Sequence, residues 1–254
     1  MRRFMSATLA VLAATIVVPA PSASAASGCQ AAAHRGAHGP GATENGMGAF
    51  WAAARAGAEI LEGDVHASSD DGLVLMHDAT LGRTTTGRGY VADYRARRIH
   101  QVLLDDGRAV PYLWQLLELA RDKDRVALVE LKAMGTWTSY VRLARLVRRY
   151  GSEHVVIQSW SMLRLHRIRR LVDVRTALVT ATPVPIGTAR AAGGLVLEER
   201  AATDGYLKSL AGMPVYVWPV DAPDGWRRLA GRVTAVITND AVGFIAARAT
   251  SPSC

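Results

Sequence analysis

The chain has 254 residues, of which 50% are hydrophobic and 20% are charged, with 30 Lys and Arg against 22 Asp and Glu and a formal net charge of +8. This composition excludes an intrinsically disordered chain, a collagen and a small disulfide-rich scaffold. A globular chain of this length holds one large domain or two medium ones, because single hydrophobic cores stop growing at roughly 250–300 residues, and we favour one.

Residues 1–25 have the pattern of a secretory signal peptide. Two arginines precede an apolar run over 7–18, and the small-residue pattern Ala-Ser-Ala follows at 23–25. The run is shorter than the roughly 20 residues that span a membrane, and no later stretch is long enough. We therefore expect residues 1–25 to be removed and residues 26–254 to form one secreted domain without stable membrane insertion.

Cys29 and Cys254 are the two cysteines of the chain. Export places both in an oxidising compartment, where we expect them to form a disulfide bond with each other. The alternative is a lipid anchor, because residues 26–29 read Ala-Ser-Gly-Cys and are similar to a weak lipoprotein box, in which Cys29 would be acylated.

From Gln30 onward, short β-favouring runs alternate with longer helical patterns, which indicates parallel strands joined by helical crossovers. The predicted strands cover 30–35, 60–66, 73–77, 126–132, 155–159, 175–180, 194–198, 214–220 and 234–238. The predicted helices cover 44–56, 113–121, 138–150, 163–172, 203–211, 224–231 and 242–248. The crossover at 181–193 is poorly marked.

These strands are one more than a (β/α)₈ barrel needs. Residues 67–72 separate two of them with an Asp-Asp-Gly turn, and a parallel crossover needs a dozen or more residues, so the two strands form a hairpin. That pairing sets His77 roughly opposite Glu62 or Gly63. We predict an α/β fold, a (β/α)₈ TIM barrel with a β-hairpin inserted after the second strand, and an open doubly wound sheet is the alternative.

Ionisable residues at the carboxyl ends of buried strands mark the face where barrel active sites are built. Glu62 and Asp64 point to the same side of their strand, because side chains alternate with a period of two. With Glu130 they make a three-carboxylate set that suits Ca²⁺ or Mg²⁺ rather than zinc. The alternative is a network of salt bridges with Arg35 and Lys132.

A second group of residues suits phosphate. His34 can exchange a proton with a phosphoryl oxygen, and Arg35 can bind two oxygens through its planar fork. The alternative is a core histidine beside an arginine whose charged end reaches the surface. His77 ends the hairpin, and Lys132 would supply another positive charge. Four further candidates, each of which could instead be a helix cap or part of the core, are Glu44, Asn45, Gln158 and Trp218.

Six segments of the chain resemble the glycerophosphodiester phosphodiesterase family. They are AHRG at 33–36, ATENGMGAF at 42–50, GAEILEGDVH at 57–66, DGLVLMHDATLGRTTTGRG at 71–89, LVELK at 128–132 and VYVWPVD at 215–221. The resemblance implies a (β/α)₈ barrel that binds one divalent cation, often Ca²⁺ or Mg²⁺. It also implies cleavage of glycerophosphodiesters to glycerol 3-phosphate and an alcohol, in which one histidine and the metal activate the glycerol 2-hydroxyl and the other histidine protonates the leaving alcohol.

The resemblance also implies roles for individual residues. They are Glu62, Asp64 and Glu130 as metal ligands, His34 and His77 as the acid/base pair, Arg35 and Lys132 on phosphate oxygens, Glu44 near the metal and Trp218 at the glycerol end. The chain departs from the family pattern at Gly46, Gly63, Pro219 and Asn239, the last of which interrupts a usual Ile-Thr-Asp ending. We therefore expect a substrate pocket that differs from that of its relatives.

The substrate and partners stay open at this stage. The basic charge suits phosphate polymers or anionic lipid, so wall polymers of glycerol phosphate are candidate substrates, although arginine-rich helical faces such as 142–149 also account for it. No nucleic-acid-binding motif is present. One alternative is a phospholipase D-like enzyme acting on lysolipid or sphingolipid head groups, which needs an exposed apolar loop that the sequence does not indicate. The other is a phosphate-ligand-binding barrel without turnover.

Overall fold

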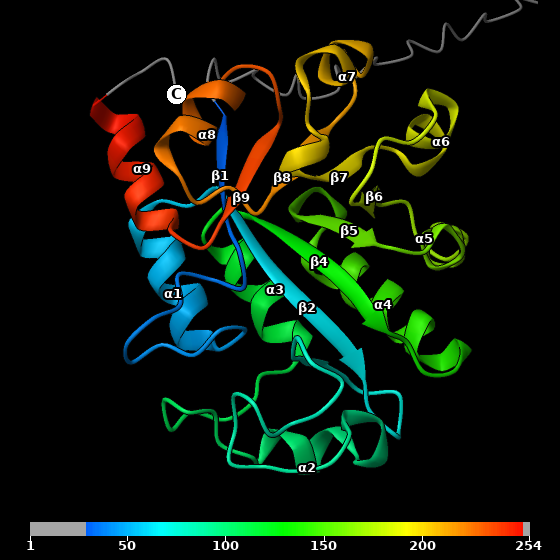
Figure 1. The fold of residues 1–254 in the computed structure, drawn as a ribbon. Helices are drawn as coiled ribbons and strands as arrows, with labels where there is room; N and C mark the ends of the chain where they lie inside the picture. Colours follow the sequence, from blue (N-terminus) through cyan, green and yellow to red (C-terminus); the bar gives the residue numbers. More distant parts are fainter. Residues whose placement is uncertain (1–28, 251–254) are drawn as a thin grey trace, which may run out of the picture.

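The computed structural model describes residues 29–250, coloured along the chain in Figure 1. The predicted signal peptide at 1–25 and Cys254 lie outside these residues. Cleavage, the Cys29–Cys254 disulfide and acylation of Cys29 therefore stay predictions. Within the described range, no helix is both long enough and apolar enough to cross a membrane.

Parallel strands close into a barrel, because β1 pairs with both β2 and β9 and so joins the two ends of the sheet. The open-sheet alternative is thus wrong and the predicted TIM barrel is confirmed. Among residues 29–250 the eight barrel strands are β1 (Gln30–Ala33), β2 (Ile60–Ala67), β4 (Val126–Ala133), β5 (Val155–Ser159), β6 (Arg175–Thr180), β7 (Leu195–Glu198), β8 (Val215–Trp218) and β9 (Ala235–Thr238).

The ninth strand, β3 (Leu73–Leu75), pairs antiparallel with β2 and forms the predicted hairpin. The register Val65 to Leu75 continues through a hydrogen bond of 3.0 Å from the Met76 backbone N–H to the Asp64 carbonyl. Counting on by one residue sets His77 opposite Gly63, one of the two positions expected. The hairpin therefore carries His77 to the carboxyl end of the barrel.

Helices cover the outside of the barrel (Figure 1). They are α1 (Met47–Ala56), α3 (Leu113–Asp122), α4 (Trp137–Tyr150), α5 (Met162–Arg169), α6 (Ile186–Ala192), α7 (Asp204–Ser209), α8 (Pro223–Leu229) and α9 (Ala241–Thr250). A short α2 (Ala96–His100), which the sequence did not predict, lies in the insertion at 68–112. Helix α6 occupies the poorly marked crossover, where Gly187 and the preceding prolines weaken the helical pattern.

Several predicted boundaries near the site are wrong. The hairpin strand ends at Leu75 rather than at 77, and the strand predicted at 214–220 ends at Trp218. The first strand ends at Ala33 rather than Arg35, because the chain turns through positive φ at Arg35 and Gly36. A Cβ at Gly36 would lie 2.7 Å from the Ala49 backbone, so only glycine permits this close approach to α1. Helix α1 begins at Met47 rather than at 44, because the backbone of Asn45 adopts the left-handed conformation, which does not fit a right-handed helix.

The inward face of the barrel changes from apolar to polar along its axis. Its apolar layer includes Ile60 of β2 and Leu128 of β4, which pack with inward residues of the other barrel strands. Further along the same face, β2 carries Glu62 and then Asp64, and β4 carries Glu130. Apolar side chains therefore fill the barrel interior toward the amino ends of the strands, and ionisable groups line it at the carboxyl ends.

Candidate active site

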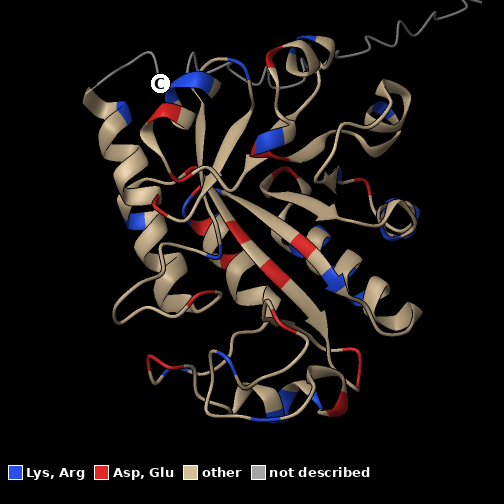
Figure 2. Cartoon of the chain, viewed as in Figure 1, with Lys and Arg blue, Asp and Glu red and all other residues tan. Residues whose placement is uncertain are grey.

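The metal-ligand candidates converge at the carboxyl end of the barrel. Glu62 and Asp64 lie on β2, and Asp64 pairs with Glu130 of β4 in the strand register. One oxygen from each of the three carboxylates lies within 4.8 Å of the others. Figure 2 shows acidic bands on β2 and β4, with a basic band further along β4. The predicted carboxylate triad is therefore assembled by two neighbouring strands.

The environment of the triad fits a divalent cation. Glu62 and Asp64 are each 1% exposed and Glu130 is 9% exposed. Burial and then the charge of Asp64 raise the pKa of Glu62 well above its usual range, and the same two causes raise the pKa of Glu130. An all-oxygen set whose negative charges repel one another in a buried site suits Ca²⁺ or Mg²⁺.

Two residues with strained backbones orient the triad. Arg35 and Asn45 have φ of 59° and 57°, in the left-handed region that non-glycine residues rarely adopt. The Arg35 backbone N–H donates to Glu62 Oε2 at 2.9 Å. Asn45 is buried, and its side chain donates to Asp64 Oδ2 and accepts from the Asp64 backbone N–H, both at 2.9 Å. Strain at these positions therefore serves the geometry of the site.

Arg35 and Lys132 bring positive charge to the same place. Arg35 Nε lies 3.2 Å from Asp64 Oδ2, and Lys132 Nζ lies 3.1 Å from Glu130 Oε1 and 3.5 Å from Asp64 Oδ1. Burial alone would lower the pKa of Lys132, but Asp64 and Glu130 outweigh it and raise that pKa, so the ammonium group stays charged. The salt-bridge network considered as an alternative thus exists together with the triad.

His77 lies against a carboxylate. Its Nδ1 is 2.6 Å from Asp78 Oδ1, and Arg83 donates to both oxygens of Asp78 and both oxygens of Glu44. The hydrogen bonds from Arg83 hold the pKa of Asp78 at about 2. Burial would raise the pKa of Glu44, but hydrogen bonds led by that from Arg83 lower it to about 2. Nε2 of the buried His66 lies 3.0 Å from the His77 carbonyl and steadies the backbone there.

His34 lies against an amide. Its Nδ1 is 2.7 Å from Asn239 Oδ1, and Asn239 Nδ2 donates to Asp221 Oδ2 at 2.7 Å. Burial, followed by the nearby charge of Arg35, lowers the pKa of His34 below its ordinary value. The two histidines therefore occupy opposite electrostatic environments, one beside a neutral acceptor and one beside a full negative charge.

A pocket joins these groups and has a polar and an apolar side. Its polar side is lined by His34, Arg35, Glu62, His77, Glu130, Lys132 and Gln158, and its apolar side by Trp160, Val179, Val196, Trp218 and Ile237. The rings of Trp160 and Trp218 meet edge to face with centroids 5.9 Å apart. Gln158 Nε2 donates to Glu62 Oε1 at 2.8 Å, while Gln158 Oε1 and Trp218 Nε1 are buried without protein partners.

The sequence candidates meet in this site, although not all in the expected role. Asn45 anchors Asp64 rather than capping a helix, and Glu44 pairs with Arg35 and Arg83 rather than joining the triad. Sequence reasoning did not assign roles to five residues that the structure places here: His66, Arg83, Trp160, Asp221 and Asn239. Of these, only Asn239 carried a specific indication, as a departure from the family pattern.

Exposed apolar side chains also follow two strands at this end of the barrel. Trp160, at the end of β5, is 50% exposed, and Leu163, in the first turn of α5, is 57% exposed. Trp137, which opens α4 after β4, is 51% exposed. Trp160 also lines the pocket, and the three side chains belong to the neighbouring crossovers that follow β4 and β5.

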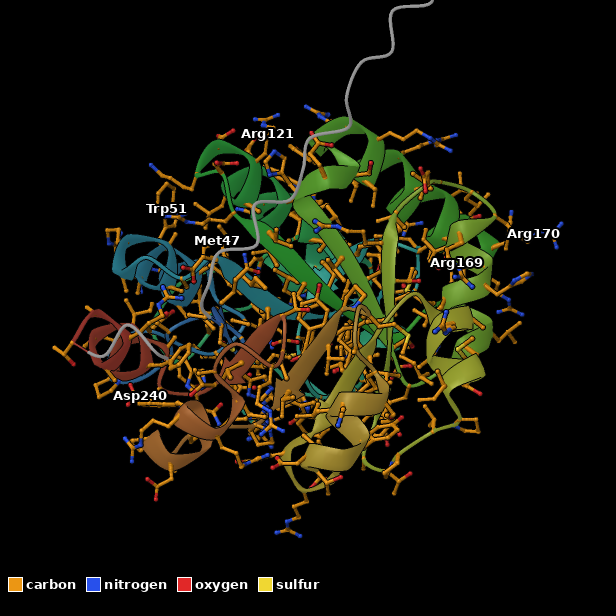
Figure 3. All side chains as sticks on the ribbon, turned by 90° about the horizontal axis from the view of Figure 1, so that it is seen from above. Met47, Trp51, Arg121, Arg169, Arg170 and Asp240 are labelled. Carbon is orange, nitrogen blue, oxygen red and sulfur yellow. The ribbon has the colours of Figure 1, made fainter. Side chains whose placement is uncertain are left out.

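Much of the positive charge lies elsewhere. Figure 3 shows Arg121, Arg169 and Arg170 on or beside the outer helices, with side chains directed away from the barrel, and all three are exposed. This arrangement favours arginine-rich helical faces as a main source of the basic charge.

Comparison with known proteins agrees with this geometry. Residues 34–242 match the Glycerophosphoryl diester phosphodiesterase family. The chain belongs to this family. The family is one of enzymes that use a divalent metal, so the carboxylate triad is its metal-binding candidate in this chain.

Individual relatives support the assignment to the glycerophosphoryl diester phosphodiesterase family. The chain is 30% identical over 236 residues to Probable glycerophosphodiester phosphodiesterase 2 of Mycobacterium tuberculosis, covering 83% of this chain and 87% of that protein. It is 31% identical over 151 residues to a glycerophosphodiester phosphodiesterase of Caldanaerobacter subterraneus, covering 55% of this chain and 61% of that enzyme, which is less than two thirds of its length. A phosphodiesterase of Oleispira antarctica, solved with the product sn-glycerol-3-phosphate, shares the fold with a TM-score of 0.75 at 19% identity, over 86% of this chain and 96% of that chain.

Proposed function

We propose that the protein is a metal-dependent phosphodiesterase that hydrolyses glycerophosphodiesters, or polymers of glycerol phosphate, to glycerol 3-phosphate and an alcohol. The observation that carries the proposal is the buried carboxylate triad in the same pocket as two histidines and two cationic side chains. Membership of the family supports the activity, and the product in the Oleispira structure supports the substrate class.

The triad would hold Ca²⁺ or Mg²⁺ through Glu62, Asp64 and Glu130. Bound there, the cation would supply Lewis acidity to the phosphoryl group and reduce the repulsion among the carboxylates. Arg35 and Lys132 line the same pocket and would bind phosphoryl oxygens, the first through its planar fork and the second as a point charge.

The two histidines would divide the proton transfers according to their partners. His34, beside an amide, starts neutral, and its Nε2 takes the proton of the glycerol 2-hydroxyl as that oxygen attacks phosphorus. His77, beside the Asp78 carboxylate, starts protonated and donates its Nε2 proton to the leaving oxygen as the bond from phosphorus to that oxygen breaks. A cyclic phosphate results, and water then opens it while the histidines reverse their roles.

The test is release of glycerol 3-phosphate from glycerophosphocholine and, separately, from a glycerol-phosphate polymer, each with Ca²⁺, with Mg²⁺ and with chelator. We expect metal-dependent release that His34→Ala abolishes and that His154→Ala leaves unchanged, because His154 precedes β5 at the opposite end of the barrel. Comparison of the two substrates and the two metals ranks them. Absence of release under every condition contradicts the proposal and favours a barrel that binds phosphate ligands without turnover.

A second candidate function, hydrolysis of lysolipid or sphingolipid head groups, is favoured by Trp137, Trp160 and Leu163, whose exposed side chains could contact a lipid surface. Its test adds lysophosphatidylcholine micelles as a substrate. Cleavage of this lipid faster than of glycerophosphocholine, lost in Trp137→Ser with glycerophosphocholine cleavage unchanged, would favour it.

We also propose that residues 1–25 direct export and are removed, leaving residues 26–254 as the mature barrel domain. The support is the sequence pattern at the N-terminus. Mass spectrometry of protein recovered from the culture medium should give a chain that begins at Ala26 and is lighter by two hydrogen atoms than its reduced form, as a Cys29–Cys254 disulfide requires. A membrane-bound chain with added acyl mass would instead indicate a lipid anchor.

A further inference from the structure

A chain of hydrogen bonds at the ends of β8 and β9 leads to His34. Asp221 follows β8 by three residues and Asn239 directly follows β9, and these two strands are neighbours in the barrel. The segment that follows β8 is joined to β9 by a hydrogen bond of 3.0 Å from the Val220 backbone N–H to the Ile237 carbonyl. Strand order therefore brings a carboxylate and an amide together beside the first strand.

Asp221 is held by three donors from the end of β9. Its Oδ1 accepts from Thr238 Oγ1 at 3.0 Å and from the Asn239 backbone N–H at 2.8 Å, and its Oδ2 accepts from Asn239 Nδ2 at 2.7 Å. The same segment holds His34 by its backbone, since the His34 N–H donates to the Thr238 carbonyl at 3.0 Å. Both the backbone and the ring of His34 are thus positioned from residues 238 and 239.

The donor and acceptor roles along this chain follow from chemistry. An ionised carboxylate only accepts, so the amide nitrogen of Asn239 must face Asp221. Asn239 Oδ1 must then face His34 Nδ1, as observed at 2.7 Å. An amide oxygen also only accepts, so His34 Nδ1 must carry a proton, and Nε2 remains as the nitrogen that can receive one.

We propose that Asn239 is a positioning residue for His34 and that Asp221 acts through it, selecting the tautomer with the proton on Nδ1 and leaving Nε2 to act as the base. Asn239 is a neutral spacer, so the ring is oriented by a carboxylate that it does not touch. This inference rests on the proposed function for its kinetic consequence, whereas the tautomer can be measured without turnover.

Asp221→Asn tests the proposal by reversing the direction of the hydrogen bonds from residue 221 through Asn239 to His34. Thr238 Oγ1 and the Asn239 N–H keep the new amide oxygen at the place of Oδ1, so the new NH₂ group faces Asn239 and turns its amide over. Asn239 Nδ2 then faces His34, and the favoured tautomer carries its proton on Nε2. Adding Asn239→Asp to Asp221→Asn supplies an acceptor at 239 and restores the original tautomer. Asn239→Asp alone places two carboxylates against each other and interrupts the series of hydrogen bonds from residue 221 to His34.

The first measurement is ¹⁵N NMR of the histidine rings in the full chain, with His34→Gln used to assign the signals. We expect the Nδ1–H tautomer at His34 in the unmodified protein, the Nε2–H tautomer in Asp221→Asn, and a return to Nδ1–H in the double variant. Asp224→Asn is the matched control, because it removes an exposed carboxylate on α8 and should change nothing. An unmodified protein with the proton on Nε2, or an Asp221→Asn variant with no change, would overturn the proposal.

The second measurement is steady-state kinetics on the same variants with glycerophosphocholine. We expect kcat to fall about ten-fold or more in each single variant, with KM within about two-fold, and to recover in the double variant at a pH high enough to keep His34 neutral beside the new carboxylate at 239. A double variant no faster than the single variants, although folded by circular dichroism, contradicts the positioning role. Absence of activity in the unmodified protein would contradict the proposed function and leave the tautomer result to decide this proposal.

Discussion

The two histidines of the site lie in regions built on different principles. His34 directly follows β1, and its ring is held through the amide of Asn239 by residues that follow β8 and β9. His77 follows β3 by two residues, and its ring is held by the neighbouring Asp78, which Arg83 links to Glu44. The barrel thus supplies a neutral partner and the insertion supplies a charged one. The difference teaches that identical side chains in one pocket acquire different electrostatic environments from what their Nδ1 atoms contact, and the proposed division of proton transfers rests on this difference.

The largest expected effect is the loss of activity when either histidine is replaced, and the two losses should differ in how they depend on the leaving group of the substrate. His34→Ala and His77→Ala should each lower kcat/KM for glycerophosphocholine by about 100-fold or more, since general acid–base catalysis contributes factors of that size. With a p-nitrophenyl ester of glycerol phosphate, whose leaving oxygen needs no proton, His77→Ala should recover most of its activity and His34→Ala should not. Recovery in His34→Ala instead would reverse the two roles.

Arg83 is the next test of the comparison, because it contacts Asp78, the partner of His77, and does not contact Asn239, the partner of His34. Arg83→Gln releases Asp78 and Glu44 from their shared partner and should lower kcat by about ten-fold with glycerophosphocholine, and by less with the p-nitrophenyl ester. Arg88→Gln, an exposed arginine of the same insertion, serves as the control. Equal losses with both substrates would mean that Arg83 supports the whole pocket rather than the acid.

The pH dependence of the reaction tests the proposed role of His34 as the base. Burial and Arg35 lower the pKa of His34, so its neutral form persists to lower pH than that of a free histidine. At saturating metal, kcat/KM should therefore fall on the acid side only below about pH 6.5, the ordinary histidine value. An acid limb centred above that value would show that another group serves as the base.

The smallest expected effect concerns the triad, which serves both histidines. Burial, and then the charges of Asp64 and Glu130, raise the pKa of Glu62 in the folded chain, so ionisation of Glu62 at higher pH destabilises the fold when no cation is bound. In chelator, Glu62→Gln should melt a few degrees above the unmodified protein at pH 8, and the gap should close as the pH falls and Glu62 binds a proton. With Ca²⁺ or Mg²⁺ the order should reverse, because the variant loses a ligand. A gap that widens as the pH falls would contradict this account.

Local patterns in the sequence were sufficient for the barrel and for the triad. The period of two places Glu62 and Asp64 on one face whatever the strand neighbours are. The short link at 67–72 excludes a parallel crossover, so the hairpin and the position of His77 followed from chain length. Helix α6 was missed because its helical pattern is weak and its formation depends on packing against the barrel. The start of α1 at Met47 was missed because the left-handed conformation of Asn45 depends on its contact with Asp64.

By itself, the sequence determined which chemistry is present: three carboxylates, two histidines and two cations at the ends of strands. Only the tertiary structure decided which groups touch. Asn239 reaches His34 across 205 positions of the chain and Arg83 reaches Glu44 across 39, and both contacts exist because the barrel closes and the insertion folds back onto its rim. A hydrogen bond depends on distances of a few tenths of an ångström, which no periodicity encodes. The different partners of the two histidines are therefore decided by the fold.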